Sequence, residues 1–303
     1  MRTTRIVRLA MIPAFATAFA LVAWTGTPVD AQGNAREQTL FVSAVDAGSA
    51  PVEGLGPADI LVREDGARRE VLRVSRATEP IDIALLVDNS TASDDLIPST
   101  REGLKTFIAA MAPGNAIAIV GLADRPTIIV DYTSDQKRLT DGIGRLFTQP
   151  SSGMTFLDAI VEVSQGLAKR DTARAVIIPI ITDGVEFTNR HYKDVIEAMT
   201  RAGVGFHALA VGRFSISNDE ATRDREYVLD IGARDTGGQR VSLLSATAVR
   251  QALQKLAREL SSQYKVVYSR PETLIPPSKI EVSSVRAGIT MRATPARGQK
   301  TGG

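Results

Sequence analysis

The middle of the chain alternates between short apolar runs and amphipathic stretches. Residues 81–87 and 175–181 are apolar at nearly every position, which is typical of strands buried on both faces of a sheet. Between them, residues 96–111 place their large apolar side chains on one side of a helix. Strands that alternate with helices predict a doubly wound α/β domain with a mostly parallel sheet.

The same alternation continues along the chain to residue 262. Further strands are expected at residues 116–122, 127–130, 204–211 and 240–244, and further helices at 135–147, 155–170, 190–202, 222–233 and 246–262. Only residues 123–126 separate two of these strands, whereas a parallel crossover needs a dozen or more residues. We therefore expect one antiparallel strand at the edge of the sheet.

Two residues inside the expected strands stand out. Pro179 lies in a strand that should be central, and we expect a local bulge there because proline cannot donate to the ladder. His207 lies among apolar residues in the middle of a strand, and we expect a core residue with satisfied polar atoms rather than a catalytic base.

Both flanks of the α/β region return to β patterns. Residues 39–45 alternate, residues 60–63 and 70–74 flank the hairpin signal Asp65-Gly66, and residues 264–268, 280–285 and 289–292 are β-rich. Each flank is too small to be stable alone, so we expect them to pair into one small β domain. The expected divisions are a signal peptide (1–31), an N-terminal β segment (32–79), the α/β domain (80–262), a C-terminal β segment (263–294) and a flexible tail (295–303).

The first 31 residues have the three parts of a signal peptide. A basic start with three arginines precedes an apolar run over residues 9–23, and Val29 and Ala31 place small residues before a cut after Ala31. An uncleaved membrane anchor is the alternative, although the run is short for a span of about 20 residues. We expect export to the periplasm or the cell exterior, without membrane insertion after cleavage.

Charge and rare residues exclude several classes of function. The chain has 36 Lys and Arg against 34 Asp and Glu, and loss of the signal peptide leaves 33 of each, with no block of like charge. This balance gives little support to nucleic-acid or anionic-membrane binding. The absence of cysteine removes disulfides and thiol chemistry, and two histidines make a His-based metal site or triad a poor fit.

Oxygen-bearing side chains follow two of the expected buried strands. Asp88 follows the strand at residues 81–87, and Asp183 follows the strand at 175–181. In an open α/β sheet, ligands bind at the carboxyl ends of the strands, where the strand order reverses. With hydroxyls from Ser90 and Thr155, two carboxylates form a hard oxygen shell of the kind that Mg²⁺ or another divalent cation prefers.

These residues resemble the metal-ion-dependent adhesion site of the von Willebrand factor type A (VWA) family. That site has Asp-x-Ser-x-Ser after the first strand, a Thr before the third helix and Asp-Gly after the fourth strand. The resemblance implies the metal ligands Asp88, Ser90, Thr155 and Asp183. Ala92 stands where the family has its second serine, so we expect a weaker site or a water in place of that hydroxyl.

The segments on either side of the core are similar to those of exported bacterial VWFA-related proteins. In VWA domains the face around the metal engages a partner protein, often through a partner carboxylate that completes the metal shell. The resemblance therefore implies a protein-binding module that is not an enzyme. The residues expected to contact the partner are Asn89, Thr91, Gly153, Met154 and Glu186.

Several alternatives stay open at this point. Asp88 to Ser90 could be an ordinary loop, Thr155 with Asp158 a helix capping box, and Asp183-Gly184 a plain turn. The protein could be a structural envelope component with a non-functional metal site. It could also be a Mg²⁺-dependent phosphoryl hydrolase with Asp88 as nucleophile, although the chain has no acidic residue two positions later and no glycine-rich phosphate loop.

Overall fold

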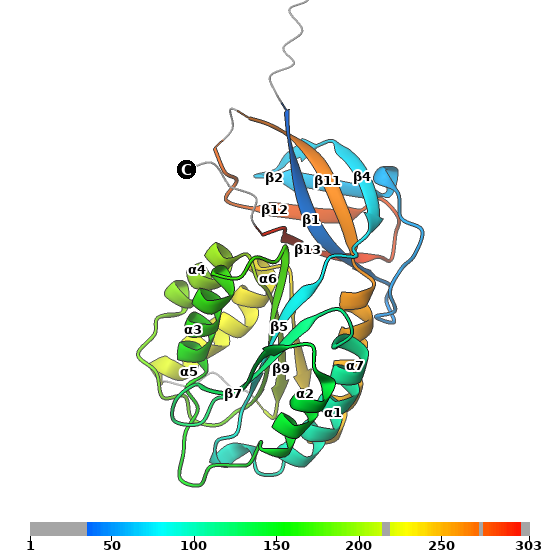
Figure 1. Ribbon diagram of the computed structural model, residues 1–303. Coiled ribbons are helices and arrows are strands. Elements are labelled where there is room, and N and C mark those ends of the chain that lie inside the picture. Colours follow the sequence, from blue (N-terminus) through cyan, green and yellow to red (C-terminus); the bar gives the residue numbers. More distant parts are fainter. Residues whose placement is uncertain (1–34, 214–218, 273–274, 298–303) are drawn as a thin grey trace, which may run out of the picture. The chain divides into compact units, whose positions relative to one another are not determined.

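The computed structural model describes residues 35–213, 219–272 and 275–297 (Figure 1). The expected signal peptide and the last six residues of the tail lie outside the described residues. The part described contains a six-stranded sheet with helices on both faces and two smaller antiparallel sheets.

The six-stranded sheet has the order β10-β9-β8-β5-β6-β7. Its strands are β5 (Ile81–Val87), β6 (Ala116–Gly121), β7 (Thr127–Thr133), β8 (Arg174–Thr182), β9 (Gly205–Val211) and β10 (Gln239–Leu243). All neighbouring pairs are parallel except β6 and β7, which are antiparallel. The predicted fold class, a doubly wound sheet with one antiparallel edge strand, is confirmed.

Helices cover the two faces of this sheet because alternate side chains of the central strand are buried in opposite directions. Ile83, Leu85 and Val87 pack with one set of helices, whereas Ala84 and Leu86 pack with the other. The first set is α1 (Ile97–Met111), α2 (Gln136–Gly144) and α7 (Val249–Ser261). The second face is covered by α3 (Phe156–Ala168), α4 (Tyr192–Ala202), a π-helical turn (Val228–Gly232) and α6 (Ala233–Asp235), with α5 (Glu220–Tyr227) leading into that turn. Each fully buried aliphatic side chain contributes roughly 1.5–3 kcal/mol.

The terminal segments together form the two antiparallel sheets, which we call the β module. One sheet has the order β13-β1-β11-β4 and the other the order β12-β2-β3. The strands are β1 (Ala35–Val45), β2 (Ile60–Glu64), β3 (Ala67–Arg69), β4 (Val71–Arg76), β11 (Tyr264–Pro271), β12 (Ile280–Ser284) and β13 (Thr290–Pro295). Since β1 pairs with both β11 and β13, the first strand of the module is held by the last part of the chain.

Two local expectations are wrong. The Asp65-Gly66 turn joins β2 to the short β3, but the strand after it, β4, leaves this hairpin and pairs with β11, because Val71 and Val74 pack into the core of the β module. Pro179 causes no bulge, since its pairing with Leu86 continues an unbroken register. The φ angle of proline suits an extended strand, and its cost here is one donor of the ladder.

The β module joins the α/β core at the amino ends of the core strands. Arg297, just after β13, donates hydrogen bonds to the carbonyl of Ala202 at the end of α4 (2.9 Å) and to the hydroxyl of Thr172 (3.0 Å). The Thr294 hydroxyl donates to the carbonyl of Thr236 (2.9 Å). The carboxyl ends of the core strands lie at the opposite edge of the sheet, where loops follow them (Figure 1).

Candidate functional site

The strand order of the large sheet reverses between β5 and β8. From β5 the chain passes through α1 to β6 on one side, whereas β8, β9 and β10 lie on the other. Ligand sites of open α/β sheets form at the carboxyl edge of such a reversal. Asp88 follows β5 and Asp183 follows β8, so the two carboxylates expected from the sequence come from adjacent strand ends.

Asp88 is fully buried, with 0 % of its surface exposed. One carboxylate oxygen accepts from the backbone N–H of Ser90 (2.9 Å). The other accepts from the backbone N–H of Thr182 (3.1 Å) and from the Thr182 hydroxyl. Thr182 was not expected at the site from the sequence. The one feature that could have indicated it is its position directly before Asp183. The structure thus brings Asp88, Ser90 and Thr182 into direct contact.

Ser90 is buried and precedes a 3-10 turn without capping it through its side chain. Its hydroxyl faces Gly184, because a Cβ atom placed on this glycine would lie 3.7 Å from Ser90 Oγ. The same Cβ would lie 2.6 Å from the Ala92 methyl carbon and 3.1 Å from Thr182 Oγ1. The loop after β8 can therefore approach the loop after β5 only because residue 184 has no side chain.

Thr155 lies at the start of α3, but its hydroxyl does not cap that helix. It donates instead to the carbonyl of Leu122, at the end of β6 (3.0 Å). The backbone N–H of Leu157, in the first turn of α3, donates to the carboxylate of Glu186 (3.2 Å). A capping box of Thr155 with Asp158 is thus excluded, because a residue from another loop supplies the cap.

Asp183 lies differently from Asp88. It is exposed, and one of its carboxylate oxygens accepts from the backbone N–H of Arg213 (3.2 Å). A Cβ atom on Gly212 would lie 2.9 Å from the Asp183 carboxyl carbon, so this carboxylate lies close against the backbone that follows β9. Asp183 therefore lies at the rim of the site, whereas Asp88 lies at its base.

Asn89 ties the neighbouring loops together. Its side-chain oxygen accepts from the backbone N–H groups of Leu122 (2.9 Å) and Ala123 (3.0 Å), and its carbonyl accepts from the N–H of Gln149 (2.8 Å). Since Leu122 also holds the Thr155 hydroxyl, Asn89 fixes the position of Thr155 relative to Asp88. Buried hydrogen bonds of this kind make the edge rigid.

Thr91 is exposed, unlike the other residues expected to contact a partner. Asn89, Gly153, Met154 and Glu186 are buried, so in this arrangement they shape the surface from below. Burial raises the pKa of Glu186 to about 8, because its carboxyl group is removed from water.

Three exposed apolar residues that were not expected from the sequence lie on these loops. Phe147, Val185 and Phe187 have 63 %, 62 % and 59 % of their surfaces exposed. Backbone hydrogen bonds from Met154 to Val185 (2.9 Å) and from Phe187 to Met154 (2.7 Å) hold this loop, and the Phe187 ring covers Gly153. The alternation Val185-Glu186-Phe187 could have indicated these exposed residues, because alternate side chains of an extended segment point to opposite sides. Here Glu186 points inward and its two neighbours point outward.

The oxygen atoms at this edge are of the type that a hydrated divalent cation binds. Mg²⁺ takes one or two carboxylates and keeps several waters, and here Asp88 offers a buried carboxylate beside the hydroxyl of Ser90. Ala92 contributes no ligand atom. Among the residues that the structure describes, no cluster of three or more His, Cys, Asp or Glu side chains could hold a metal ion. A cation here would therefore depend on hydroxyls and water as much as on carboxylates.

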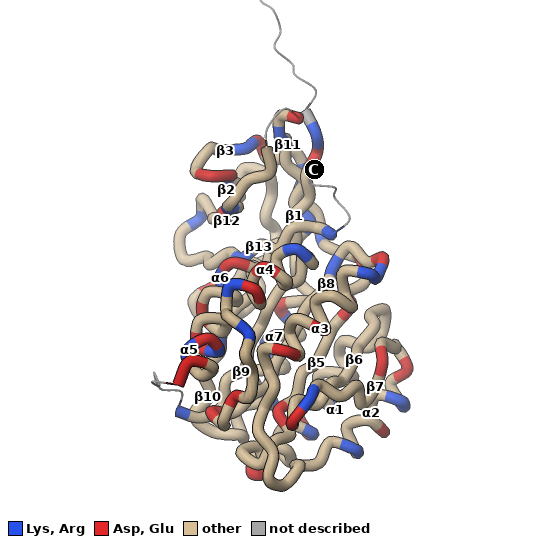
Figure 2. The backbone as a smooth tube through the Cα atoms, turned by 90° about the vertical axis from the view of Figure 1, so that its left-hand side faces the viewer, with Lys and Arg blue, Asp and Glu red and all other residues tan. Residues whose placement is uncertain are grey.

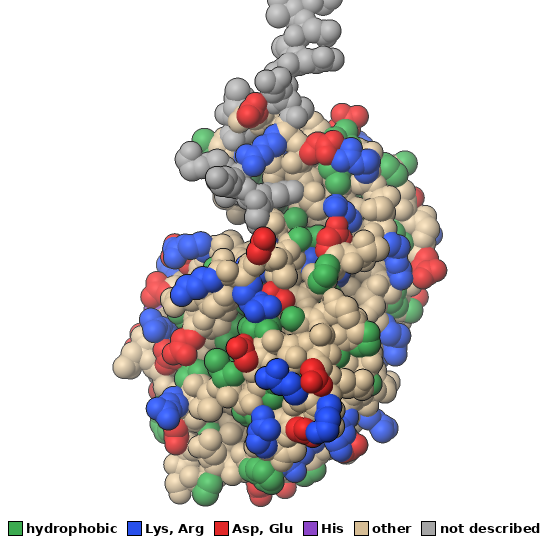
Figure 3. Space-filling view, in the orientation of Figure 1, with side chains coloured by type: hydrophobic (Ala, Val, Ile, Leu, Met, Phe, Trp, Pro, Cys, Tyr) green, Lys and Arg blue, Asp and Glu red, His purple; other side chains and the backbone are tan. Residues whose placement is uncertain are grey.

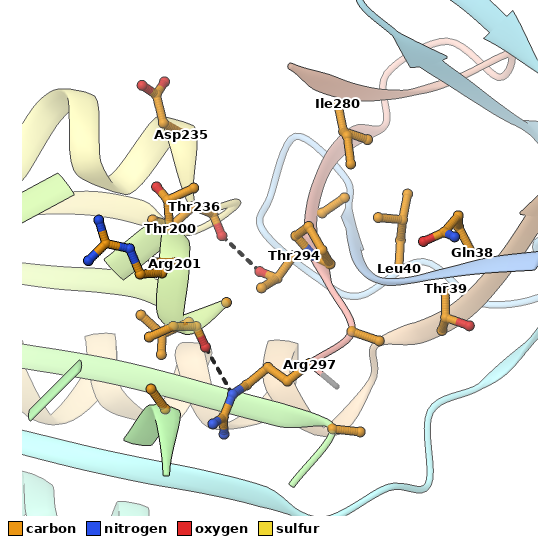
Figure 4. A pocket seen from close by; sticks show the side chains of 18 of the residues that line it. Gln38, Thr39, Leu40, Thr200, Arg201, Asp235, Thr236, Ile280, Thr294 and Arg297 are labelled. Atoms are coloured by element: carbon orange, nitrogen blue, oxygen red, sulfur yellow. Dashed lines mark hydrogen bonds between the residues drawn. The ribbon is translucent and has the colours of Figure 1, made fainter. Parts of the chain in front are cut away.

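A cavity of about 960 Å³ lies at the opposite edge of the sheet, at the amino ends of the strands, between the core and the β module (Figure 4). Two arginines that line it already have partners. Arg170 pairs with Asp82 (2.6 Å), and Arg297 donates to the carbonyl of Ala202 at the end of α4 (2.9 Å). Figure 2 shows basic and acidic residues intermixed along the backbone of both parts, and Figure 3 shows their side chains intermixed on one face. The carboxyl edge is therefore the stronger candidate for the functional site.

Comparison with protein families gives a match to the von Willebrand factor type A domain over residues 83–186. This range begins in β5 and ends after β8, and it contains all four expected metal ligands. A comparison with curated proteins found no match. Within residues 35–213, 219–272 and 275–297, no helix has both the length and the apolar character needed to span a bilayer.

Several solved structures are similar to this chain. The vWF domain of the type V pili tip protein Mfa5 from Porphyromonas gingivalis is 12% identical, with a TM-score of 0.48, over 60% of this chain and 95% of that chain. BatB from Bacteroides thetaiotaomicron is 16% identical, with a TM-score of 0.47, over 60% and 100%. A von Willebrand factor type A protein from Catenulispora acidiphila is 11% identical, with a TM-score of 0.48, over 87% and 73%.

Proposed function

Because residues 83–186 match the von Willebrand factor type A domain, we propose that this chain is an exported protein-binding module whose partner docks on the carboxyl edge of the six-stranded sheet. The observation that carries the proposal is the construction of that edge. Polar groups of the Asp88 site lie at its base, and exposed apolar side chains in rigid loops surround them. Recognition usually resides in loops held by a rigid scaffold.

The apolar residues supply the contact area. Phe147, Val185 and Phe187 remain exposed although the chain buries most of its large apolar side chains. Exposed apolar groups that are held in place in advance lose little entropy on binding and are typical anchors of protein interfaces. They come from two loops, one before α3 and one after β8, that are both hydrogen-bonded to the site.

The metal site is the second element of the proposal. Asp88, Ser90 and Thr155 would hold a divalent cation such as Mg²⁺, with Asp183 at the rim. A bound cation would offer an open coordination position to a carboxylate of the partner. Ala92 weakens this arrangement, so we propose that apolar contact provides more of the affinity here than it would with a complete set of ligands.

The hydrolase alternative is disfavoured by the residues around Asp88. The chain has Ser90 in place of an acidic residue two positions after Asp88, and it has no glycine-rich phosphate loop after that strand. Export is inferred from the signal-peptide pattern of residues 1–31, which also places the proposed partner in the periplasm or outside the cell.

The test uses two substitutions of the same kind at equal exposure. Val185→Asp changes the carboxyl edge, whereas Val285→Asp changes a residue of the β module that is 59 % exposed. Each protein is immobilised and incubated with envelope extract in Mg²⁺ or in chelator. We expect a protein retained by the wild type and by Val285→Asp to be lost from Val185→Asp. If Val185→Asp retains the same proteins as the wild type, the carboxyl edge is not the docking surface.

A further inference from the structure

The cavity between the α/β core and the β module contains a polar side chain whose hydrogen-bonding groups are unused. Gln38 of β1 lines this cavity of about 960 Å³ (Figure 4). Only 7 % of its surface is exposed, yet no hydrogen bond within the described residues involves its carboxamide. The carboxamide oxygen and nitrogen are not sealed in the interior, so a molecule in the cavity can reach them. Because buried polar groups are normally paired, this carboxamide indicates a ligand or ordered water.

The position of Gln38 in β1 does not require a polar side chain for folding. Alternate residues of a strand share a face, and the next two on this face, Leu40 and Val42, belong to the apolar core of the β module. Tyr268, which pairs with Gln38 across the sheet, donates its hydroxyl to Glu64 instead (2.7 Å). The carboxamide is therefore left facing the cavity at the open end of the β module's core.

The edge of β1 beside Gln38 is open. Residues 35–38 pair with β11 on one side, but β13 follows the other side of β1 only as far as the pair Leu40 and Pro295. There the chain turns toward the core, where the backbone N–H of Arg297 donates to the carbonyl of Ala173 (2.9 Å). Among the described residues, no other strand lies on that side of residues 35–38.

The backbone of Glu37 presents its hydrogen-bonding groups to this open side. The carbonyl of Thr39 faces the side of β13, because it accepts from the N–H of Ala296 (3.0 Å). Backbone groups of an antiparallel strand alternate between its two sides, so the N–H and C=O of Glu37, two residues earlier, face the same way as the carbonyl of Thr39. Such an open edge can pair with another strand.

The charges around the cavity do not indicate an ionic ligand. Five basic and four acidic residues line it. Two of the basic residues pair within the lining, Arg201 with Glu197 and Arg270 with Glu64. Leu40 and Ile280 add apolar surface (Figure 4). The wall therefore favours an occupant that is largely uncharged and that carries both donors and acceptors.

We infer that this cavity binds an extended peptide of a partner protein, which adds a strand to β1. A peptide main chain has alternating N–H and C=O groups, which complement both the backbone of Glu37 and the carboxamide of Gln38. The side chains on one face of the peptide lie against Leu40 and Ile280. A strand rises about 3.3 Å per residue, so about five residues of the partner cover the open edge. The site is independent of the one proposed at the carboxyl edge of the large sheet.

Nuclear magnetic resonance of the glutamine side chains tests this inference. The probe is the peptide acetyl-Thr-Val-Thr-Val-Thr-amide, and the control is the same peptide with every backbone nitrogen methylated, which cannot donate. The side-chain signals of Gln38 in ¹⁵N-labelled protein are assigned by their loss in Gln38→Leu. We expect the probe to shift these signals in a saturable way and the methylated peptide to bind about tenfold more weakly. Equal shifts with both peptides, or no shift with either, would overturn the inference.

Two substitutions at residue 37 separate strand addition from general effects, with the anisotropy of a fluorescently labelled probe as the measurement. Glu37→Pro removes the N–H on the open side, and proline is tolerated on an edge of a sheet. It should weaken binding about tenfold. Glu37→Ala loses the same exposed ion pair with Arg73 but keeps the N–H, so it should bind like the wild type. Equal binding by the two variants would show that the peptide does not pair with β1.

Substitution of Gln38 gives a second measurement that does not depend on the folding of Glu37→Pro. Gln38→Leu suits the apolar face of β1 and should weaken binding of the probe severalfold. Gln251→Leu, the same change at an exposed position of α7, should leave binding unchanged. If Gln38→Leu binds the probe as tightly as Gln251→Leu does, the carboxamide does not contact the peptide and the inference is wrong.

Sedimentation velocity without the peptide distinguishes a partner peptide from a second copy of the chain. We expect no dimer that depends on the edge of β1. A dimer that Glu37→Pro dissociates would mean that the edges of two copies pair with each other, and it would overturn the assignment to a partner peptide.

Discussion

A carboxyl oxygen of Glu186 accepts a hydrogen bond from the backbone N–H of Leu157 at 3.2 Å, so the loop after β8 caps a helix that begins beside Thr155. A threonine at this position would ordinarily cap the helix itself. Because Glu186 takes that role, the Thr155 hydroxyl is directed to the end of β6 instead. The loop after β8 and the start of α3 are thus joined through one buried side chain.

Removal of this cap should lower the stability of the protein. Glu186→Ala leaves the first turn of α3 without its acceptor and should cost about 1–2 kcal/mol of unfolding free energy, the usual loss for a helix cap. Glu186→Gln keeps an acceptor oxygen and should cost less, because the raised pKa keeps the carboxyl group largely neutral near pH 7. Urea denaturation of both variants measures the difference. Equal losses would show that the cap contributes nothing.

The close contact between Gly184 and Ala92 predicts that a change at one residue can compensate for a change at the other. Gly184→Ala places a methyl group 2.6 Å from the Ala92 methyl and should destabilise the protein by about 1–3 kcal/mol, as overpacking usually does. Ala92→Gly alone should have a small effect, since Ala92 is exposed. The double variant should recover much of the loss, which a double-mutant cycle from denaturation curves would show. Simple additivity of the two changes would contradict the contact.

Divalent cations should stabilise the native protein if the Asp88 site binds them. Mg²⁺ at millimolar concentration should stabilise the wild type by about 1 kcal/mol, or roughly 2–4 °C for a protein of this size. Ala92→Ser restores a hydroxyl and should enlarge the shift, whereas Asp183→Ala should abolish it. Asp95→Ala, which removes an exposed carboxylate of the loop after β5, is the control and should behave as the wild type. If Mg²⁺ leaves the melting temperature of the wild type and of every variant unchanged, the metal site is ruled out.

His207 should make stability depend on pH in the acid range. Burial lowers the pKa of His207 to about 4, below its ordinary value of about 6.5. Between these values the unfolded chain binds a proton at residue 207 that the native protein does not, so stability falls as the pH falls from about 6.5 to 4. The loss amounts to about 3 kcal/mol at most. In denaturation curves against pH, His207→Gln should show a shallower decline over this window, and an identical decline would refute the assignment.

The expected signal peptide, residues 1–31, should be removed on export. Val29 and Ala31 suit signal peptidase, so the exported protein should begin at Gln32. Its net formal charge would then be zero, compared with +2 for the full chain. Intact-mass measurement or N-terminal sequencing of the exported protein decides the point. Recovery of a chain that retains Met1 in the membrane fraction would favour the uncleaved anchor.

The sequence predicted those features that depend on local pattern. Apolar runs such as residues 81–87 identified the buried strands, and the four-residue connection at 123–126 was enough to require an antiparallel edge strand. Asp88 and Asp183 could be placed at adjacent strand ends because the carboxyl ends of parallel strands share one edge. Periodicity and loop length act over a few residues, so they are visible in the chain itself.

Only the tertiary structure decided which side chains face one another across that edge. No local pattern shows that Thr182 binds Asp88, that Glu186 caps α3, or that Asp183 is held by the backbone at Arg213. Glu186, which the family resemblance places among the partner contacts, is buried, while Phe187 is exposed and Nδ1 of His207 has no hydrogen-bond partner among the described residues. These contacts join segments about 30 to 90 residues apart, and their geometry is set by how the loops pack after the sheet has formed. Residue type limits what each side chain can do, while packing determines which partner it meets.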